Sequence, residues 1–243
     1  MTAFRATGIA LFCGLAPLCA QAASEWGGTV SLVSDYVFRG VTQTRGGEAL
    51  QADVHWHSDT GLLAGAWAST VDPNPGPGPT VEVNFYAGVV RELADDWVAR
   101  LLAIHYAYPN DTTTFRWDYD EVAASLAFRD RVAATIAWSP NYSSYSNGEF
   151  VGDRTTVSYE LSTQFPFRNH WLASAGAGYQ DLDNHFGTGY VFWNCALSYS
   201  AAPWQLTLAR FGTNDRAGYL YGSEATEDRW SLGLQWQFGG VVR

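Results

Sequence analysis

Hydrophobic and polar residues alternate one by one along much of this chain. In residues 50–57 every second residue is apolar, and the positions between them hold Gln51, Asp53, His55 and His57. Similar alternation recurs through residues 81–89, 155–165 and 229–238. Successive side chains of a β-strand point to opposite faces, so each segment is predicted to form a strand with one apolar and one polar face.

Twelve such segments can be traced along the chain: 29–39, 48–57, 61–71, 80–91, 97–108, 117–128, 131–142, 153–165, 171–180, 190–200, 204–212 and 228–238. Two of them interrupt the alternation, because Arg100 and Arg210 fall in register with apolar residues. Each of these two segments is therefore expected to contain a bulge or to carry its arginine at a strand end.

The connections between the segments alternate in length. The longer ones are 40–47, 72–79, 109–116, 143–152, 181–189 and 213–227, and the shorter ones are 58–60, 92–96, 129–130, 166–170 and 201–203. An even number of strands with short periplasmic turns and longer extracellular loops is typical of outer-membrane barrels. The pattern predicts an all-β fold, a transmembrane antiparallel β-barrel of about twelve strands.

The amino-acid composition excludes several classes of protein. Aromatic residues make up 15% of the chain, and no apolar stretch after the first residues is long enough for a membrane-spanning helix. The net charge is −10, which gives no electrostatic basis for binding nucleic acid. Cys195 is the single cysteine after the first 22 residues, so no internal disulfide can form there.

The first residues have the layout of a secretory signal peptide. Arg5 precedes an apolar run over residues 6–18, and the small residues Ala20 and Ala22 flank a cleavage point before Ala23. We therefore expect residues 1–22 to be removed and residues 23–243 to form one barrel in the outer membrane of a Gram-negative cell. Its expected partners are outer-membrane lipid, the barrel-assembly machinery and small polar solutes.

Part of the sequence resembles a known family. Residues 33–44, which read VSDYVFRGVTQT, are followed by Ala49-Leu50-Gln51 and later by the strand VEVNFYAG at 81–88. These segments are similar to the TorF-type porin family, also known as the Gcw_chp group of proteobacterial proteins. The resemblance implies an outer-membrane barrel of porin type and brings no substrate and no catalytic residues. The chain differs from many such barrels in continuing beyond its last aromatic residue, Phe238.

The polar face of the strands is where function is expected. By alternation, the residues predicted to line a pore are Asp35, Arg39, Gln51, Asp53, His55, Glu82, Asn84, Glu121, Arg154, Glu160, Arg229 and Gln235. They favour a porin-like channel for passive passage of small polar or ionic solutes, and the acidic net charge favours cations. The alternative is a plugged barrel, in which the same charges pair with one another and leave no path.

The sequence gives only weak support for a catalytic or metal-binding function. His55 and His57 could face one metal ion, but no third ligand can be placed, so neither metal nor cofactor is expected. A lipid-modifying enzyme would need a serine and a histidine near the outer face of the membrane. His57 adjoins Ser58 at a short turn, which is the opposite end, and His105 has no serine nearby in sequence. We therefore expect no enzyme.

A structural or binding barrel is the remaining alternative to a channel. Residues 143–152, with Tyr142 beside them, contain Tyr145 and Phe150 among serine and asparagine residues, and residues 213–227 contain Tyr219 and Tyr221. Aromatic rings among small polar residues suit stacking on sugars, and they equally suit ordinary packing within a loop.

Overall fold

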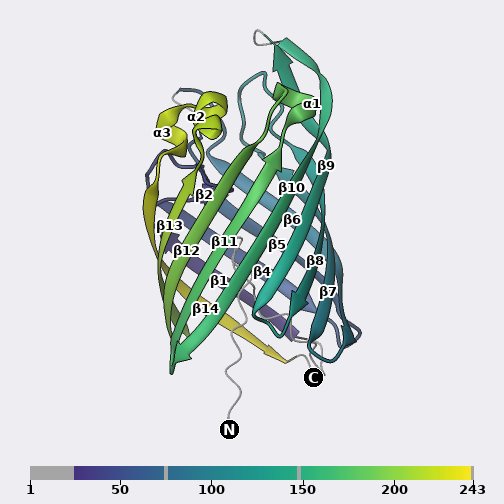
Figure 1. Cartoon of the computed structure of the whole chain (residues 1–243), viewed down its shortest axis with the longest axis vertical. Helices are drawn as coiled ribbons and strands as arrows, with labels where there is room; N and C mark the ends of the chain where they lie inside the picture. Colours follow the sequence, from purple (N-terminus) through teal and green to yellow (C-terminus); the bar gives the residue numbers. More distant parts are fainter. Residues whose placement is uncertain (1–24, 74–75, 147–148, 242–243) are drawn as a thin grey trace.

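The computed structural model describes residues 25–73, 76–146 and 149–241, and the predicted signal peptide lies outside these ranges. Within them, twelve strands form one closed antiparallel barrel (Figure 1). These strands are β1 (Glu25–Val33), β4 (Ala49–His57), β5 (Leu62–Thr70), β6 (Val81–Ala94), β7 (Trp97–Ala107), β8 (Tyr119–Phe128), β9 (Val132–Ser146), β10 (Glu149–Arg168), β11 (Trp171–Asp181), β12 (Tyr190–Ala201), β13 (Trp204–Thr213) and β14 (Arg229–Val241). Each strand pairs with its neighbour in this order, and β1 closes the barrel by pairing with β14. The predicted fold class is confirmed.

The two faces of the barrel differ in the way that alternation predicts. Large apolar side chains on the outward face are exposed, among them Leu32, Leu50, Val54, Phe85, Leu101, Ile136, Leu161, Leu206 and Leu234. The residues next to them in sequence point inward, and many of these are polar. A continuous apolar exterior of this size would be unfavourable in water and is suited to the hydrocarbon core of a bilayer.

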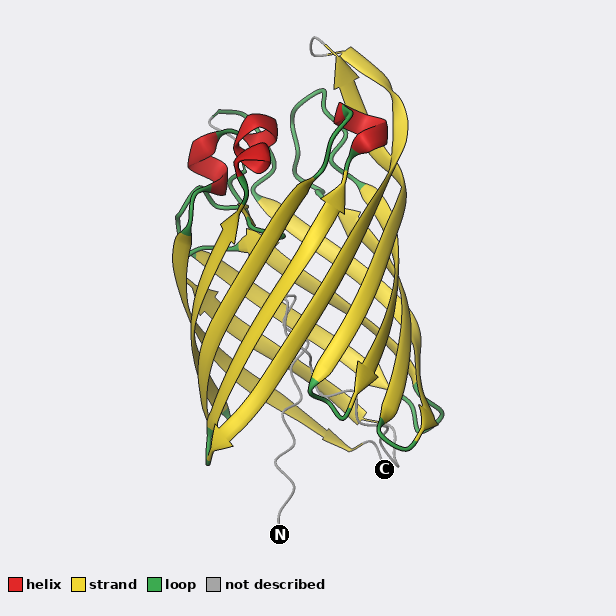
Figure 2. Ribbon diagram, in the orientation of Figure 1, coloured by secondary structure: helices red, strands yellow, loops and turns green. Residues whose placement is uncertain are grey.

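The barrel has two unlike ends. At the end called here the short-turn end, strands are joined by a few residues, and β1 begins and β14 ends there. At the opposite, long-loop end lie the helices α1 (Asp183–Phe186), α2 (Asp215–Tyr221) and α3 (Ser223–Thr226), drawn in red in Figure 2. Among the described residues, no helix is both long and apolar enough to cross a membrane.

The first predicted strand, 29–39, is wrong in its second half. β1 ends at Val33, and the chain then turns to form a small hairpin of β2 (Val37–Phe38) and β3 (Val41–Thr42). At the tip of this hairpin Arg39 has φ 49° and Gly40 has φ 80°. Two successive residues with positive φ form the kind of tight turn that reverses a two-stranded ribbon, so a strand cannot continue through them.

The predicted loop 143–152 is largely strand. β9 continues to Ser146 and β10 starts at Glu149, and the two remain paired beyond the level where β10 pairs with β11. They form a two-stranded ribbon that rises above the rest of the long-loop end (Figure 1). Phe150 and Val151 favour extended backbone, which is why this connection is strand rather than loop.

The two arginines that interrupt the alternation have different explanations. Arg100 lies on the inward face of β7, with Leu102 and Ile104, and the pairing of β7 with β8 runs through it without a bulge. Arg210 faces outward near the long-loop end of β13. It pairs with Asp228 at 3.0 Å and lies over the ring of Trp230. Arg210 lies within β13 and is paired on both sides, so neither segment contains the predicted bulge. Arg100 needs no irregularity because part of the inward face is apolar.

Candidate functional site

Residues 34–48, called here the lumen hairpin, fold from the long-loop end into the barrel. The Tyr36 ring meets the edge of Trp67 on β5 at 5.4 Å between centroids. The tip of the hairpin contacts two other strands: Arg39 pairs with Glu121 on β8, and Gly40 lies against β13. β8 lies far from β1 in the order of strands around the barrel. The lumen hairpin therefore crosses the interior from one side to the other.

Glycine is required at the tip for two reasons. A Cβ atom at Gly40 would lie 2.4 Å from the Cγ2 atom of Thr213 and 3.1 Å from the carbonyl oxygen of Gly212. The positive φ of Gly40 adds a second constraint, because that conformation is costly for residues with a side chain. The tip can approach β13 this closely only without a side chain.

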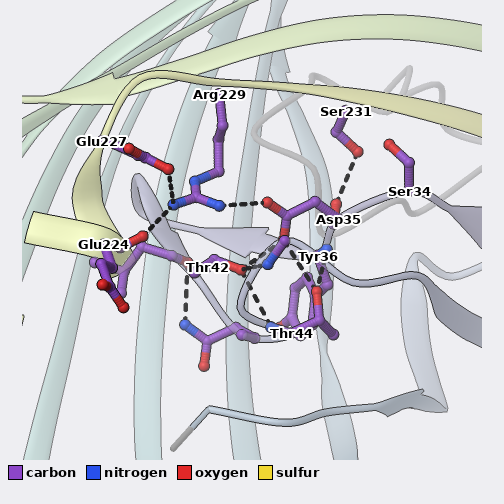
Figure 3. A network of polar contacts seen from close by, with 12 residues as sticks. Ser34, Asp35, Tyr36, Thr42, Thr44, Glu224, Glu227, Arg229 and Ser231 are labelled. Carbon is purple, nitrogen blue, oxygen red and sulfur yellow. Dashed lines mark hydrogen bonds and ion pairs between the residues drawn. The ribbon is translucent and has the colours of Figure 1, made fainter. Parts of the chain in front are cut away.

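Asp35 holds the base of the lumen hairpin (Figure 3). Its carboxylate accepts hydrogen bonds from Thr42 at 2.5 Å and Thr44 at 3.0 Å, and its other oxygen pairs with Arg229 on β14 at 2.8 Å. Its backbone carbonyl accepts a further bond from Ser231 at 2.7 Å. Asp35 and Arg229 are both largely buried, with side-chain exposures of 4% and 10%. A buried pair of this kind is costly to break because the remaining charge loses its partner.

Two further contacts fix the middle and tip of the hairpin. Arg39 donates to Glu121 at 2.8 Å, and the Tyr36 hydroxyl lies 3.5 Å from both carboxylate oxygens of Glu82. Glu82 also accepts a bond of 2.7 Å from Asn84 on its own strand. The carboxylates on β6 and β8 thus bind the hairpin from the side of the barrel opposite β13.

Below the hairpin, another buried group surrounds Asp53. Its carboxylate lies 2.5 Å from the Nδ1 atom of His55 and accepts a bond of 2.6 Å from the Tyr86 hydroxyl. The rings of His55 and His57 meet edge to face at 5.3 Å. In the ranges that the structure covers, no three histidine, cysteine or acidic residues are grouped so that they could hold a metal ion.

Most of the predicted pore-lining residues take part in these contacts. The ones buried in hydrogen-bonded or ion-paired positions are Asp35, Gln51, Asp53, His55, Glu82, Asn84 and Glu121, with Arg39 and Arg229 beside them as partners. Glu160 and Gln235 point inward and are half-buried. Arg154 is exposed, because it lies on the upper part of β10 that pairs with β9 beyond the level of β11.

The inner wall of the barrel has two different parts. The packed wall, formed by β4–β8, carries large inward side chains, among them Leu63, Trp67, Tyr86, Leu102, Ile104 and Tyr106. The polar wall is the half of β10–β14 nearer the short-turn end. Its half-buried inward side chains are mainly polar. They are the carboxylate of Glu160, the hydroxyls of Ser162, Ser174, Ser200 and Thr207, and the amides of Gln164, Gln205, Gln235 and Gln237, with Leu172 beside them. Water therefore reaches the interior along the polar wall.

A cavity of about 380 Å³, called here the chamber, lies at the long-loop end. Its floor includes Phe38 and Arg39 of the lumen hairpin, and its walls include Tyr119, Tyr142 and Tyr190 from β8, β9 and β12. Of these tyrosines, Tyr142 was predicted from the sequence as a candidate for stacking on sugars, and Tyr119 and Tyr190 were not. Each of these tyrosines lies near a long loop in the sequence, which is the only feature that could have marked them. That they line the same cavity follows from the pairing of the strands.

An arrangement suited to hydrolysis of lipid is incomplete. His105 and Asp120 pair at 2.8 Å on the outward face of β7 and β8, and Asn141 also binds Asp120. Among the described residues, no serine hydroxyl is hydrogen-bonded to His105 or Asp120. The pair thus lacks the nucleophile that acyl transfer would need.

The sequence matches the profile of one family, described as a bacterial protein of unknown function (Gcw_chp), over residues 19–238. The chain belongs to the Gcw_chp family. The family assignment agrees with the resemblance seen in residues 33–44 and 81–88. No curated protein sequence matches this Gcw_chp chain.

Solved structures similar to this Gcw_chp barrel include porins. A structure of the NanC porin has a TM-score of 0.56 and 10% identity, covering 91% of this chain and 100% of the porin. The KdgM porin has a TM-score of 0.51 and 8% identity, covering 88% of this chain and 99% of the porin. A KdgM structure in complex with disordered oligogalacturonate has a TM-score of 0.50. At such low identity these likenesses establish the shared barrel fold.

Proposed function

We propose that this protein is a channel in the outer membrane of a Gram-negative cell, through which small polar solutes pass passively. The long-loop end faces the cell exterior and the short-turn end faces the periplasm. The observation that carries the proposal is the polar wall, a water-accessible inward face enclosed by a barrel with an apolar exterior. The porin fold of the similar structures and the resemblance to TorF-type porins support it.

The proposed route runs from the chamber, past the tip of the lumen hairpin, and along the polar wall. The packed wall is occupied by large side chains and by the contacts of the hairpin, so solutes pass beside the hairpin on the side of β9–β11. Ser139, Ser158 and Gln180 face inward at that level and are buried, so this level is the narrowest part of the proposed route. Because the hairpin occupies part of the cross-section, the route admits small solutes and excludes large ones.

We further propose a mild preference for cations. Among the predicted pore-lining carboxylates, Asp53, Glu82 and Glu121 have exposures of 1%, 2% and 4%, so their charges are held away from the route. Glu160 lies on the polar wall and is half-buried. Its carboxylate is the group best placed to raise the local concentration of cations along the route.

The contacts of the hairpin favour a second candidate, a barrel closed to solutes. Asp35–Arg229 and Arg39–Glu121 anchor the hairpin at both ends, and a hairpin held this firmly could block the lumen. In that case the barrel would serve as a structural or binding protein. The two candidates differ in one property, which is the ability to conduct ions.

Purified protein in a planar lipid bilayer distinguishes the two candidates. The channel proposal predicts discrete, ohmic steps of current when single molecules insert. Folded protein is identified independently by its resistance to unfolding in detergent at room temperature. Folded, inserted protein that gives no current steps would refute the channel and favour the closed barrel.

A further inference from the structure

The chamber is walled by a continuous series of aromatic rings. Tyr106 and Tyr119 are stacked with centroids 4.2 Å apart, and Tyr119 meets Tyr142 at 5.2 Å. The series continues from Tyr142 to His185 of α1 at 5.4 Å. Tyr119, Tyr142 and His185 come from β8, β9 and α1 and line the chamber, whereas Tyr106 of β7 is stacked on Tyr119 and is not among the lining residues.

A second group of rings faces the chamber from the other side. Tyr190 of β12 and Tyr221 of α2 meet edge to face at 5.7 Å. The side chains of Tyr221 and Tyr142 interact with each other, which joins the two groups. The chamber is therefore lined by aromatic rings, several of which carry hydroxyl groups.

Three polar atoms in residues that line the chamber lack partners. Among the described residues, the Nε1 atom of Trp117, the Oε1 atom of Gln180 and the Nδ1 atom of His185 are buried and have no hydrogen-bond partner. Buried polar groups are nearly always hydrogen-bonded, and leaving one unpaired is costly. All three atoms belong to side chains that line one cavity, so a molecule held in that cavity can supply the missing hydrogen bonds.

The chamber offers little uncompensated charge to an occupant. Arg39 is paired with Glu121, and Arg116 is paired with Asp153. Burial, with a smaller contribution from Arg154, holds the pKa of His185 below its ordinary value, so its ring is neutral at pH 7. A charged ligand would find each guanidinium already bound to a carboxylate, whereas a neutral ligand needs only hydrogen bonds.

We propose that the chamber binds a neutral sugar of one or two rings. The apolar faces of the sugar ring lie against the tyrosine rings, and its hydroxyls bond to Trp117, Gln180 and His185. The volume of about 380 Å³ falls within the range of about 300–1,000 Å³ found for small-ligand pockets. This inference deepens the channel proposal, because the bound sugar would be the solute that enters the route.

Isothermal titration calorimetry on the folded barrel in detergent tests the inference. The probes are maltose, cellobiose and sucrose, with sorbitol as a flexible polyol that has hydroxyls and no ring, and digalacturonate as an acidic sugar. Saturable binding of at least one neutral disaccharide is expected, with no binding of sorbitol. The inference is refuted if no neutral disaccharide binds, or if digalacturonate binds more tightly than all of them.

Matched tryptophan variants locate the binding site. Trp117→Phe keeps an aromatic ring and removes the unpaired N–H group, so it should weaken disaccharide binding about 5- to 10-fold, as expected for one hydrogen bond. Trp138→Phe is the control, because Trp138 is exposed on the outward face of β9. Gln180→Leu should weaken binding to a similar extent as Trp117→Phe. Equal effects of the Trp117 and Trp138 changes would place the sugar elsewhere and refute the inference.

Bilayer recordings separate this inference from the channel proposal. A barrel that conducts ions and binds none of the neutral disaccharides would leave the channel proposal standing and refute the sugar site. A barrel that binds a disaccharide through Trp117 and never conducts would support the sugar site and refute the channel. When both are correct, the bound disaccharide should reduce the single-channel current, and Trp117→Phe should relieve that block.

Discussion

The packed wall of β4–β8 and the polar wall of β10–β14 arise from the same alternation of residues, yet they differ in what lies beside them. On the packed wall, Glu82 and Glu121 meet the lumen hairpin, and Leu63 and Leu102 fill the space below it. On the polar wall, Ser162 and Gln235 are half-buried, so part of each side chain stays accessible to water. Alternation thus decides which side chains point inward, and the size of their neighbours decides which of them contact water.

The largest difference between the two walls should be seen in stability. Arg229→Ala leaves the buried Asp35 carboxylate without its ion partner at the base of the hairpin, which is expected to cost about 3–5 kcal/mol in the free energy of unfolding. On the polar wall, Gln235→Ala removes a half-buried amide and should change that free energy by less than about 0.5 kcal/mol. Urea titration of the folded barrel in lipid vesicles measures both. Similar costs for the two changes would contradict the distinction.

A substitution on each face of one strand tests whether the polar wall faces water. Leu161 is exposed on the outward face of β10, and Ser162 follows it on the inward face. Leu161→Arg places a charge in lipid and should cost about 2–4 kcal/mol in the free energy of unfolding near the middle of the bilayer. Ser162→Arg should be tolerated, because its guanidinium can be solvated inside the barrel. A larger cost for Ser162→Arg than for Leu161→Arg would reverse the two faces.

Displacing the tip of the lumen hairpin should widen the proposed route and raise the single-channel conductance. Gly40→Ala introduces both backbone strain and a clash with β13, with an expected cost of about 1–3 kcal/mol in stability. Since the tip must then move away from β13, single-channel conductance should rise. The control is Gly78→Ala in the loop after β5, where a Cβ atom would meet nothing within 4 Å and conductance should not change. Unchanged conductance in folded Gly40→Ala protein would show that the tip does not limit the route.

The smallest expected effect concerns ion selectivity. Glu160→Gln removes a charge from the polar wall and should shift the reversal potential toward anion passage in a salt gradient. The shift should shrink at high ionic strength because salt screens the charges that are left. Glu82→Gln alters a carboxylate that is bound by Tyr36 and Asn84, so it should lower stability and leave the reversal potential unchanged. A shift from Glu82→Gln and none from Glu160→Gln would place the route along the packed wall.

Much of the fold could be predicted from the sequence, because alternation is a local property. The strand boundaries of 48–57 and 171–180 are within a residue of the observed β4 and β11. The lumen hairpin could not be predicted, because it is held by contacts between distant residues. Asp35 and Arg229 are separated by 194 positions, and Arg39 and Glu121 by 82. The prediction that 29–39 is one strand failed at the point where these contacts begin.

The candidate site, like the fold, could be predicted only as far as local alternation determines it. Alternation placed Gln51, Asp53 and Glu82 on the inward face, and the structure places them there. Whether they contact water depends on the lumen hairpin, which alternation does not describe. The aromatic chamber depends on the pairing of Tyr106 with Tyr119 across β7 and β8, and on the loops that cover it. Such features come from tertiary packing and leave no periodic signal in the sequence.

Cysteine accessibility during current recording shows whether solutes pass along the polar wall. In a Cys195→Ser background, which removes the exposed native thiol, Ser162→Cys places a thiol on the polar wall and Ala127→Cys places one on the packed wall. A charged, membrane-impermeant methanethiosulfonate reagent should reduce the current through the Ser162→Cys barrel in single steps and leave the Ala127→Cys barrel unchanged. Modification that alters the Ala127→Cys current and spares the Ser162→Cys current would contradict the account.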